Sequence, residues 1–168
     1  MNYIIRNKKL KIIGGNFKMR KFEFVNRILN NEDGVTRRLP ERSTKNSAGY
    51  DFFNHKRVVC KSHEITMIPT GIKAQFPEDE ALFLFNRSSN PKKKGLIILN
   101  GVGVVDSDYY NNADNEGEMS FVFYNMLNED VTLEAGEKLG QGIFMKYAKT
   151  DDDTAEGERL GGFGSTSK

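Results

Sequence analysis

The stretch GLIILNGVGVVDSDY, residues 95–109, does most to set the expected fold class. Two apolar runs flank Asn100-Gly101, a residue pair that favours a tight turn between strands. Gly103 in the second run would let a ligand or another part of the backbone approach closely. We therefore expect a β-hairpin with a polar amide at its turn, and a carboxylate, Asp106, directly after the second strand.

Short apolar runs between turn residues continue on both sides of this hairpin. No segment sustains the apolar period of about 3.6 residues that marks a long amphipathic helix. Short strands at regular spacing, separated by turns such as Pro69-Thr70-Gly71, are typical of an all-β sandwich or barrel. The expected strands cover residues 57–60, 64–68, 72–76, 81–85, 95–99, 119–124, 131–133 and 142–145.

Composition and charge limit the classes of protein that the chain can represent. Its 168 residues suit one domain, and the formal net charge of +2 without a basic stripe argues against a nucleic-acid partner. No apolar run is long enough to cross a bilayer. The single Cys60 cannot form an internal disulfide and lies in a run that predicts a buried strand, which fits the reducing cytoplasm of a bacterial or phage-infected cell.

The two ends of the chain differ from the domain expected at residues 19–149. Residues 1–18 are basic without an acidic residue, and Gly14-Gly15 can be encoded by a purine-rich ribosome-binding site, so we expect translation to start at Met19. Residues 150–168 are too polar and glycine-rich to build a core. They form either a disordered terminus or an arm that orders over a ligand, with glycine amides on phosphates and Phe163 over a base.

Three stretches could carry chemistry, although each also has a purely structural interpretation. Residues 47–51 place the Asp51 carboxylate beside a glycine at a strand start. Residues 87–89 place a guanidinium and two hydroxyls after a strand, which suits phosphate binding but also an ordinary turn. Residues 106–108 could supply a base toward water, part of a calcium-type loop or a simple turn.

Taken in order, five short stretches resemble the motifs of the trimeric dUTP diphosphatase (dUTPase) family, closest to its phage and Gram-positive bacterial members. The resemblance covers the chain from about Ala48 to its end. It implies an all-β, jelly-roll-like domain with a mobile C-terminal arm. It also implies a homotrimer, with active sites at subunit interfaces, that hydrolyses dUTP to dUMP and pyrophosphate with Mg²⁺. The five stretches are residues 47–51, 87–89, 100–109, 136–141 and 159–166.

The third motif carries the roles that the resemblance assigns to the nucleoside and to the attacking water. Asp106 matches the aspartate that activates the water for attack on the α-phosphorus. Tyr109 matches the aromatic residue that packs against the deoxyribose and excludes a 2′-hydroxyl. The uracil edge is read by the amide of Asn100 and by backbone groups of Gly103, Val104 and Val105.

The other motifs match residues that hold the triphosphate. Arg87 orders the second motif, and Mg²⁺ on the triphosphate oxygens is held by Asp51 through water. Arg159 is the clamp on the γ-phosphate, and Phe163 stacks on uracil. The remaining phosphate contacts implied by the resemblance are Ser88, Ser89, Gln141, Gly164, Ser165 and Thr166.

The chain departs from the family pattern at three places. Asn86 stands where proline is frequent, and Lys138 where arginine is frequent, which keeps the charge but loses bidentate geometry. Only Leu160 separates Arg159 from the glycines of the fifth motif.

Two alternatives to a dUTPase follow from the same resemblance. Deoxycytidine triphosphate deaminases share the fold and the triphosphate site, but they use a glutamate in a differently built third motif, so residues 104–109 favour the diphosphatase. The second alternative is a phage regulatory protein that binds a bacterial repressor. The polar loop at residues 111–115, which lengthens the hairpin, is its candidate protein contact.

Overall fold

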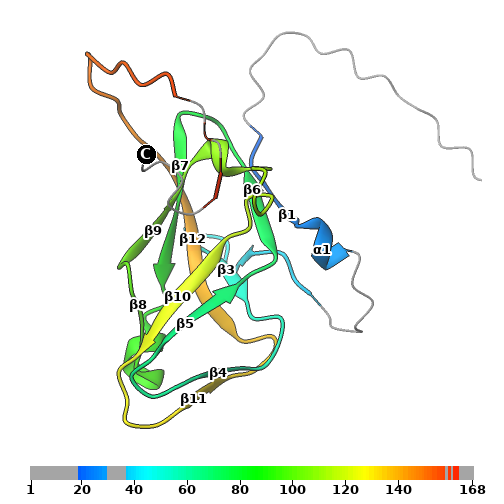
Figure 1. Ribbon diagram of the computed structural model, residues 1–168, viewed down its shortest axis with the longest axis vertical. Coiled ribbons are helices and arrows are strands. Elements are labelled where there is room, and N and C mark those ends of the chain that lie inside the picture. The colour runs from blue at the N-terminus through cyan, green and yellow to red at the C-terminus, as the bar shows by residue number, and fades with distance from the viewer. Residues whose placement is uncertain (1–18, 30–36, 158, 160, 163–168) are drawn as a thin grey trace, which may run out of the picture.

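The structure, a computed structural model, describes residues 19–29, 37–157, 159, 161 and 162 (Figure 1). The predictions made for residues 1–18 and for Phe163 to Thr166 lie outside this part of the chain. The described part is built almost entirely from short antiparallel strands, as predicted, and its longest α-helix has four residues. The all-β fold class is therefore confirmed.

Two antiparallel sheets and two smaller strand pairs make up the fold. The five-stranded sheet has the order β2 (Glu41–Arg42), β3 (Tyr50–Phe53), β12 (Lys138–Lys146), β7 (Glu80–Asn86), β9 (Val102–Val105). The three-stranded sheet has the order β5 (Ile65–Pro69), β10 (Ser120–Asn125), β8 (Leu96–Ile98). The pairs are β1 (Lys21–Phe24) with β6 (Ile72–Gln75), and β4 (Val58–Cys60) with β11 (Val131–Leu133). The helical turns are α1 (Asn26–Leu29), the π-helical η1 (Asn90–Lys94) and the 3₁₀-helical η2 (Ser107–Tyr109).

The core lies between the two sheets and is rich in aromatic rings. Alternate residues of β10 point inward, so that Phe121 and Phe123 are buried while their neighbours are half-exposed. Phe121 meets Phe52 of the opposite sheet edge-on, with ring centroids 5.5 Å apart. A Cβ at Gly140 would lie 2.1 Å from the Phe121 ring, so only glycine lets the two sheets approach this closely. Burial of each such ring contributes roughly 2–3 kcal/mol to folding.

The predicted hairpin at residues 95–109 is wrong in its pairing. β8 pairs with β10, whereas β9 pairs with β7, so the chain changes sheets at the turn around Asn100. Gly101 has a φ of 69°, which lets the backbone turn this corner at no steric cost. β8 and β9 each pair with an apolar strand, β10 and β7 respectively, that is longer than the partner they would be for each other. β9 and β10 therefore belong to different sheets, and a cavity lies between them.

The outer face of the three-stranded sheet is apolar. Ile65, Met67 and Leu99 expose 59%, 63% and 50% of their surface, although residues of this type are mostly buried. The pairing of Val122 with Met67, and of Tyr124 with both Ile65 and Ile97, places all these side chains on one face. We call Ile65, Met67, Ile97, Leu99, Val122 and Tyr124 the outer apolar face. A contiguous patch of this kind marks an interaction surface.

Cys60 lies at the end of β4 and is fully buried, which confirms the strand prediction made for it. Burial raises the pKa of its thiol, so it is a poor nucleophile. Within the described residues, no helix has both the length and the apolar character needed to span a membrane.

Candidate active site

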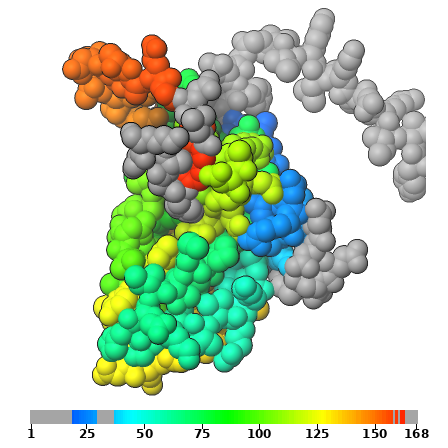
Figure 2. Space-filling view, in the orientation of Figure 1, coloured from blue at the N-terminus to red at the C-terminus, as the bar shows by residue number. Residues whose placement is uncertain are grey.

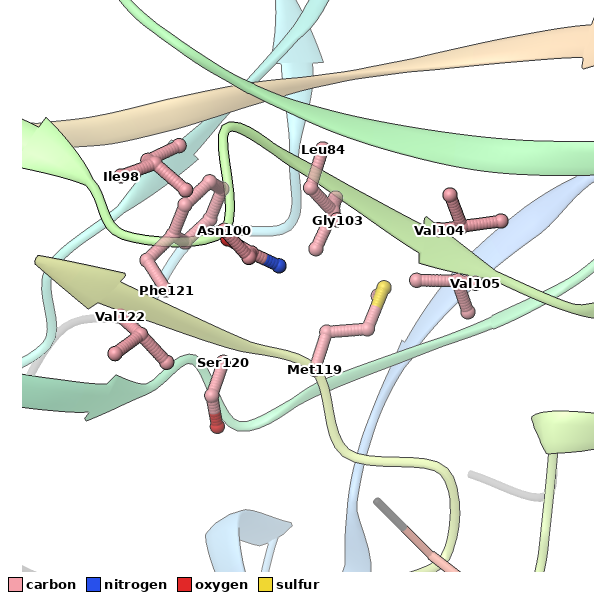
Figure 3. Close-up of a pocket in the computed structure, with 10 residues that line it drawn as sticks. All are labelled: Leu84, Ile98, Asn100, Gly103, Val104, Val105, Met119, Ser120, Phe121 and Val122. Carbon is pink, nitrogen blue, oxygen red and sulfur yellow. The ribbon is translucent and has the colours of Figure 1, made fainter. Parts of the chain in front are cut away.

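A slot of about 170 Å³ occupies the gap between β9 and β10 (Figure 3). The amide of Asn100 and the sulfur of Met119 point into it from opposite sides, and Val105 and Phe121 supply apolar walls. Gly103 adds no side chain to its wall of the slot, and a Cβ at this position would lie 3.2 Å from the Leu84 side chain. The predicted base-reading residues Asn100, Gly103, Val104 and Val105 therefore line one slot, whose side chains are apolar except for the amide of Asn100 and the hydroxyl of Ser120.

Asp106 and Tyr109 follow the slot at the end of β9. Tyr109 is buried in η2, and its hydroxyl donates to the carbonyl of Glu118 at 3.0 Å. Burial raises the pKa of Tyr109, so the hydroxyl keeps the proton that it donates. Asp106 stands exposed just before η2, where its carboxylate faces solvent beside the slot. The two predicted residues are thus held side by side by one short turn.

Arg159 of the C-terminal arm reaches this end of the slot. Its guanidinium donates to Asp106 at 2.5 Å and to Asp108 at 2.9 Å, and it lies 5.5 Å from the centroid of the Tyr109 ring. The side chain is only 10% exposed, so the arm residue is packed against the site and does not extend into solvent. Asp108 was not among the predicted site residues. The sequence signal for Asp108 was its position two residues after Asp106, because that spacing lets both carboxylates contact the guanidinium of Arg159.

A second hollow, of about 290 Å³, lies at the far end of β7, where η1 begins. Arg87 and Ser89 line it from the turn after β7, Lys93 from η1 and Lys138 from the start of β12. Ser88 lies exposed in the same turn. The hollow therefore carries more positive than negative side chains, as a phosphate-binding site requires.

Asp51 joins this second group through its cationic neighbours. It accepts hydrogen bonds from Lys138 at 2.7 Å and Ser43 at 2.6 Å, and lies 3.4 Å from the Arg87 guanidinium. Gln141 is its register partner on β12 and donates to the carbonyl of Asn86 at 3.5 Å. Lys138, which stands where the family pattern often has arginine, thus contacts Asp51 through its single nitrogen. An arginine could instead donate two hydrogen bonds to the same carboxylate.

The free energy of unfolding is expected to fall at pH 7 when Asp51 is replaced by Asn. Burial raises the pKa of Asp51, but the hydrogen bonds from Lys138 and Ser43 and the charge of Arg87 outweigh it, so the pKa lies below its usual 3.8. A carboxylate with a lowered folded-state pKa stabilises the protein above its unfolded pKa and loses that effect as the pH falls through the folded pKa. Thermal unfolding of both proteins between pH 7 and about pH 2 should therefore show a deficit that closes at acid pH. A deficit that stays constant over this range would contradict the assignment.

Asn86 has a structural role that the sequence did not reveal. It donates to the Leu96 carbonyl at 2.9 Å and accepts from Asn90 at 2.8 Å. Asn90 is buried and also donates to the carbonyl of Leu139 at 2.6 Å. Proline at position 86 could make neither side-chain bond. The asparagine pair therefore ties the turn that carries Arg87 to both β8 and β12.

The two groups of predicted residues lie at opposite ends of β7. Val105 pairs with Leu82, so Asp106 lies opposite Ala81, whereas Arg87 follows the other end of the strand. At roughly 3.3 Å per residue, the stretch from Ala81 to Arg87 spans on the order of 20 Å. Figure 1 shows the same separation, with η2 at the upper end and η1 at the lower end of the molecule. One chain therefore does not bring the predicted base and the predicted phosphate-binding turn together.

Most of the chain is similar in sequence to known nucleotidohydrolases. A dUTPase family model matches residues 36–167. A Lactococcus lactis protein named deoxyuridine 5′-triphosphate nucleotidohydrolase is 47% identical over 151 residues, which are 89% of this chain and 98% of the relative. A Fusobacterium nucleatum protein of the same name is 35% identical over 146 residues, or 82% of this chain and 93% of the relative.

Solved structures show the same similarity in three dimensions. The dUTPase of Streptococcus mutans is 43% identical and superposes with a TM-score of 0.70 over 77% of this chain and 98% of its own. The dUTPase of the Staphylococcus aureus phage phi11 is 21% identical, with a TM-score of 0.65 over 83% of this chain and 97% of its own. At that identity the phage protein supports the fold alone.

Proposed function

The chain belongs to the dUTPase family, and on that premise we propose how its residues hydrolyse dUTP to dUMP and pyrophosphate. The observation that carries the proposal is the slot between β9 and β10, with the Asn100 amide at one end and Asp106 and Tyr109 beyond the other. A base in the slot would meet one amide and the exposed backbone of β9. Its sugar would then lie against Tyr109, and its α-phosphate beside Asp106.

Asp106 acts as the general base in this proposal. Its carboxylate takes a proton from a water molecule as the water oxygen forms a bond to the α-phosphorus. The bond from that phosphorus to the bridging oxygen breaks, and pyrophosphate leaves. Most of the rate enhancement in such a reaction comes from positioning and charge stabilisation. The hollow beside Arg87, Ser89 and Lys138 supplies positive charge for the phosphates, and Arg159 would exchange its carboxylate partners for the γ-phosphate.

The donor set fits a magnesium ion that is carried by the nucleotide. Within the described residues, no three His, Cys, Asp or Glu side chains gather as a metal site of their own. An ionised carboxylate has about four acceptor positions, and the partners of Asp51 leave capacity on Oδ1, so Asp51 can accept hydrogen bonds from metal-bound water. Bound there, Mg²⁺ would neutralise charge on the triphosphate while keeping most of its water.

A homotrimer with interfacial active sites is part of the proposal. Two features support it: the distance between Asp106 and Arg87 within one chain, and the outer apolar face, which a second copy would cover. Subunits related by a rotation axis would place the second hollow of one chain against the slot of its neighbour. We infer that the enzyme works in the cytoplasm, where its substrate is made. The repressor-type protein partner at residues 111–115 stays a prediction.

A pyrophosphate-release assay with dUTP, dTTP, dCTP and UTP, each with and without Mg²⁺, tests the function. We expect magnesium-dependent turnover of dUTP, because the closely walled slot excludes a 5-methyl group and Tyr109 excludes a 2′-hydroxyl. The release of ammonia from dCTP would instead indicate a deaminase. A folded protein that releases no pyrophosphate from dUTP would overturn the proposal.

A further inference from the structure

The loop at residues 111–115, together with Glu116 and Gly117, is held in one conformation by its own side chains. The side-chain oxygen of Asn112, Oδ1, accepts hydrogen bonds from the backbone amides of Asp114 and Asn115, at 3.0 and 3.2 Å. Asn112 also donates to the Tyr109 carbonyl at 3.0 Å, which fastens the loop to η2. Gly117 has a φ of 82°, and a Cβ there would lie 2.4 Å from the Tyr109 carbonyl oxygen. The loop is therefore a folded extension of the turn that carries Asp106 and Tyr109.

One side chain of this loop reaches into the site. Asn115 donates to the Tyr109 hydroxyl at 2.7 Å, while that hydroxyl donates to the Glu118 carbonyl. The side-chain oxygen of Asn115, Oδ1, accepts in turn from the backbone amide of Gly117 at 3.1 Å and from the side-chain amide of Asn112 at 2.8 Å. The Tyr109 ring is thus fixed from its hydroxyl end by the loop.

A second side chain of the loop contacts the C-terminal arm. Asp114 accepts a hydrogen bond from the backbone amide of Gly162 at 2.7 Å, and Gly162 is buried. In Figure 2 the described end of the arm, drawn in red, lies beside the yellow-green surface of the loop and the turn before it. Asp114 uses only its backbone amide inside the loop, so its carboxylate is not needed to fold the loop. Three residues before Gly162, Arg159 reaches Asp106 and Asp108. The arm is therefore held at two points, and one of them is the loop.

We propose that the 111–115 loop is the dock of the C-terminal arm, with Asp114 as the positioning residue that holds Gly162 and so brings Arg159 to the site. Because Asn115 of the same loop holds Tyr109, arm docking and sugar binding share one element. The dock itself rests on the contacts of this chain alone, whereas its kinetic consequence rests on the proposed function. Asp114 carries the only carboxylate among residues 111–115, and the hydrogen bond from the Gly162 amide uses it.

A designed disulfide tests the dock directly. A Cβ at position 162 would lie 3.6 Å from the Asp114 Cβ, within the roughly 3.5–4.5 Å range of disulfides. The variant Asp114→Cys/Gly162→Cys should therefore form this bond under mild oxidation, while the buried Cys60 stays reduced. Peptide mass mapping identifies the bond, and a non-reducing gel tells whether it lies within one chain or between two, either of which supports the dock. If both introduced thiols remain free, the dock is wrong.

Kinetics of single variants test what the dock does. Asp114→Ala should raise the KM for dUTP about tenfold, the loss expected for one hydrogen bond to a charged acceptor, with little change in kcat. Asp114→Asn keeps an acceptor oxygen and should restore KM to within about threefold of the parent. Asp130→Ala is the matched control, because Asp130 also accepts a backbone amide from a distant segment, that of Ser62, but lies at β11.

Different results would contradict the docking of the arm and the proposed dUTPase function. An unchanged KM in Asp114→Ala, with melting temperature and dUTP turnover intact, would overturn the dock and leave the dUTPase function standing. A disulfide that forms in a protein unable to turn over dUTP would leave the dock standing and remove the function.

Discussion

The variant Asp106→Asn is expected to hydrolyse dUTP about 1,000-fold more slowly than the parent, the size of effect that a positioned general base supplies. The amide has nearly the shape of the carboxylate but cannot take a proton from water. Asp106 is exposed and lies at the start of η2 without a side-chain cap, so the substitution should leave the fold unchanged. Pyrophosphate release at saturating dUTP with Mg²⁺ measures the loss, and the melting temperature checks the fold.

The matched control for this loss is Asp130→Asn. Asp130 is another exposed carboxylate with a cationic partner, Lys61, but it lies at β11, far from the slot. Its variant should keep parental kcat. Binding of dUTP to Asp106→Asn, followed by calorimetry, should persist because Asn100, Tyr109 and the phosphate hollow are unaltered. A variant that keeps more than about a tenth of parental kcat would show that another group takes the proton.

The strands were predictable because burial on one face imposes a period of two on the sequence. The apolar runs at residues 65–69, 72–75 and 131–133 became strands within a residue or two of the expected bounds. Pairing was not predictable from the same pattern. The turn at Asn100-Gly101 favours a hairpin locally, yet β9 gains more by pairing with β7, the seven-residue apolar strand. The slot exists because the longer-range pairing of β9 with β7 is favoured over a local hairpin with β8.

The candidate site was recognised residue by residue from its motifs, but its geometry was not. Sequence order gave no sign that Asp106 and Arg87 would lie at opposite ends of one strand, since that follows from the antiparallel register of β7 and β9. The supporting side chains were missed for a related reason. Asn90, Asp114 and Asn115 act through hydrogen bonds to distant backbone groups, and turn-type residues of this kind carry no sequence signal for such partners.

Co-expression of Asp106→Asn with Arg87→Gln is expected to restore activity that neither variant has alone. Each parent variant should be reduced by about 100-fold or more, one through loss of the base and the other through loss of charge on the phosphates. In a trimer whose sites combine Asp106 of one subunit with Arg87 of its neighbour, a site works when each chain supplies its intact residue. Random mixing of equal amounts leaves about a quarter of all sites intact.

The recovery distinguishes interfacial sites from sites within one chain. If a single chain built the whole site, no chain in the mixture would carry both intact residues, and the activity would stay at the level of the two parents. Co-expression of two differently tagged Asp106→Asn chains is the control, because it forms mixed trimers without supplying an intact base. A mixed preparation that is no more active than the two single variants, although both tags co-purify as one trimer, would place both residues in one chain. The register of β7 and β9 opposes that outcome, because it separates Asp106 from Arg87 by more than one triphosphate can bridge.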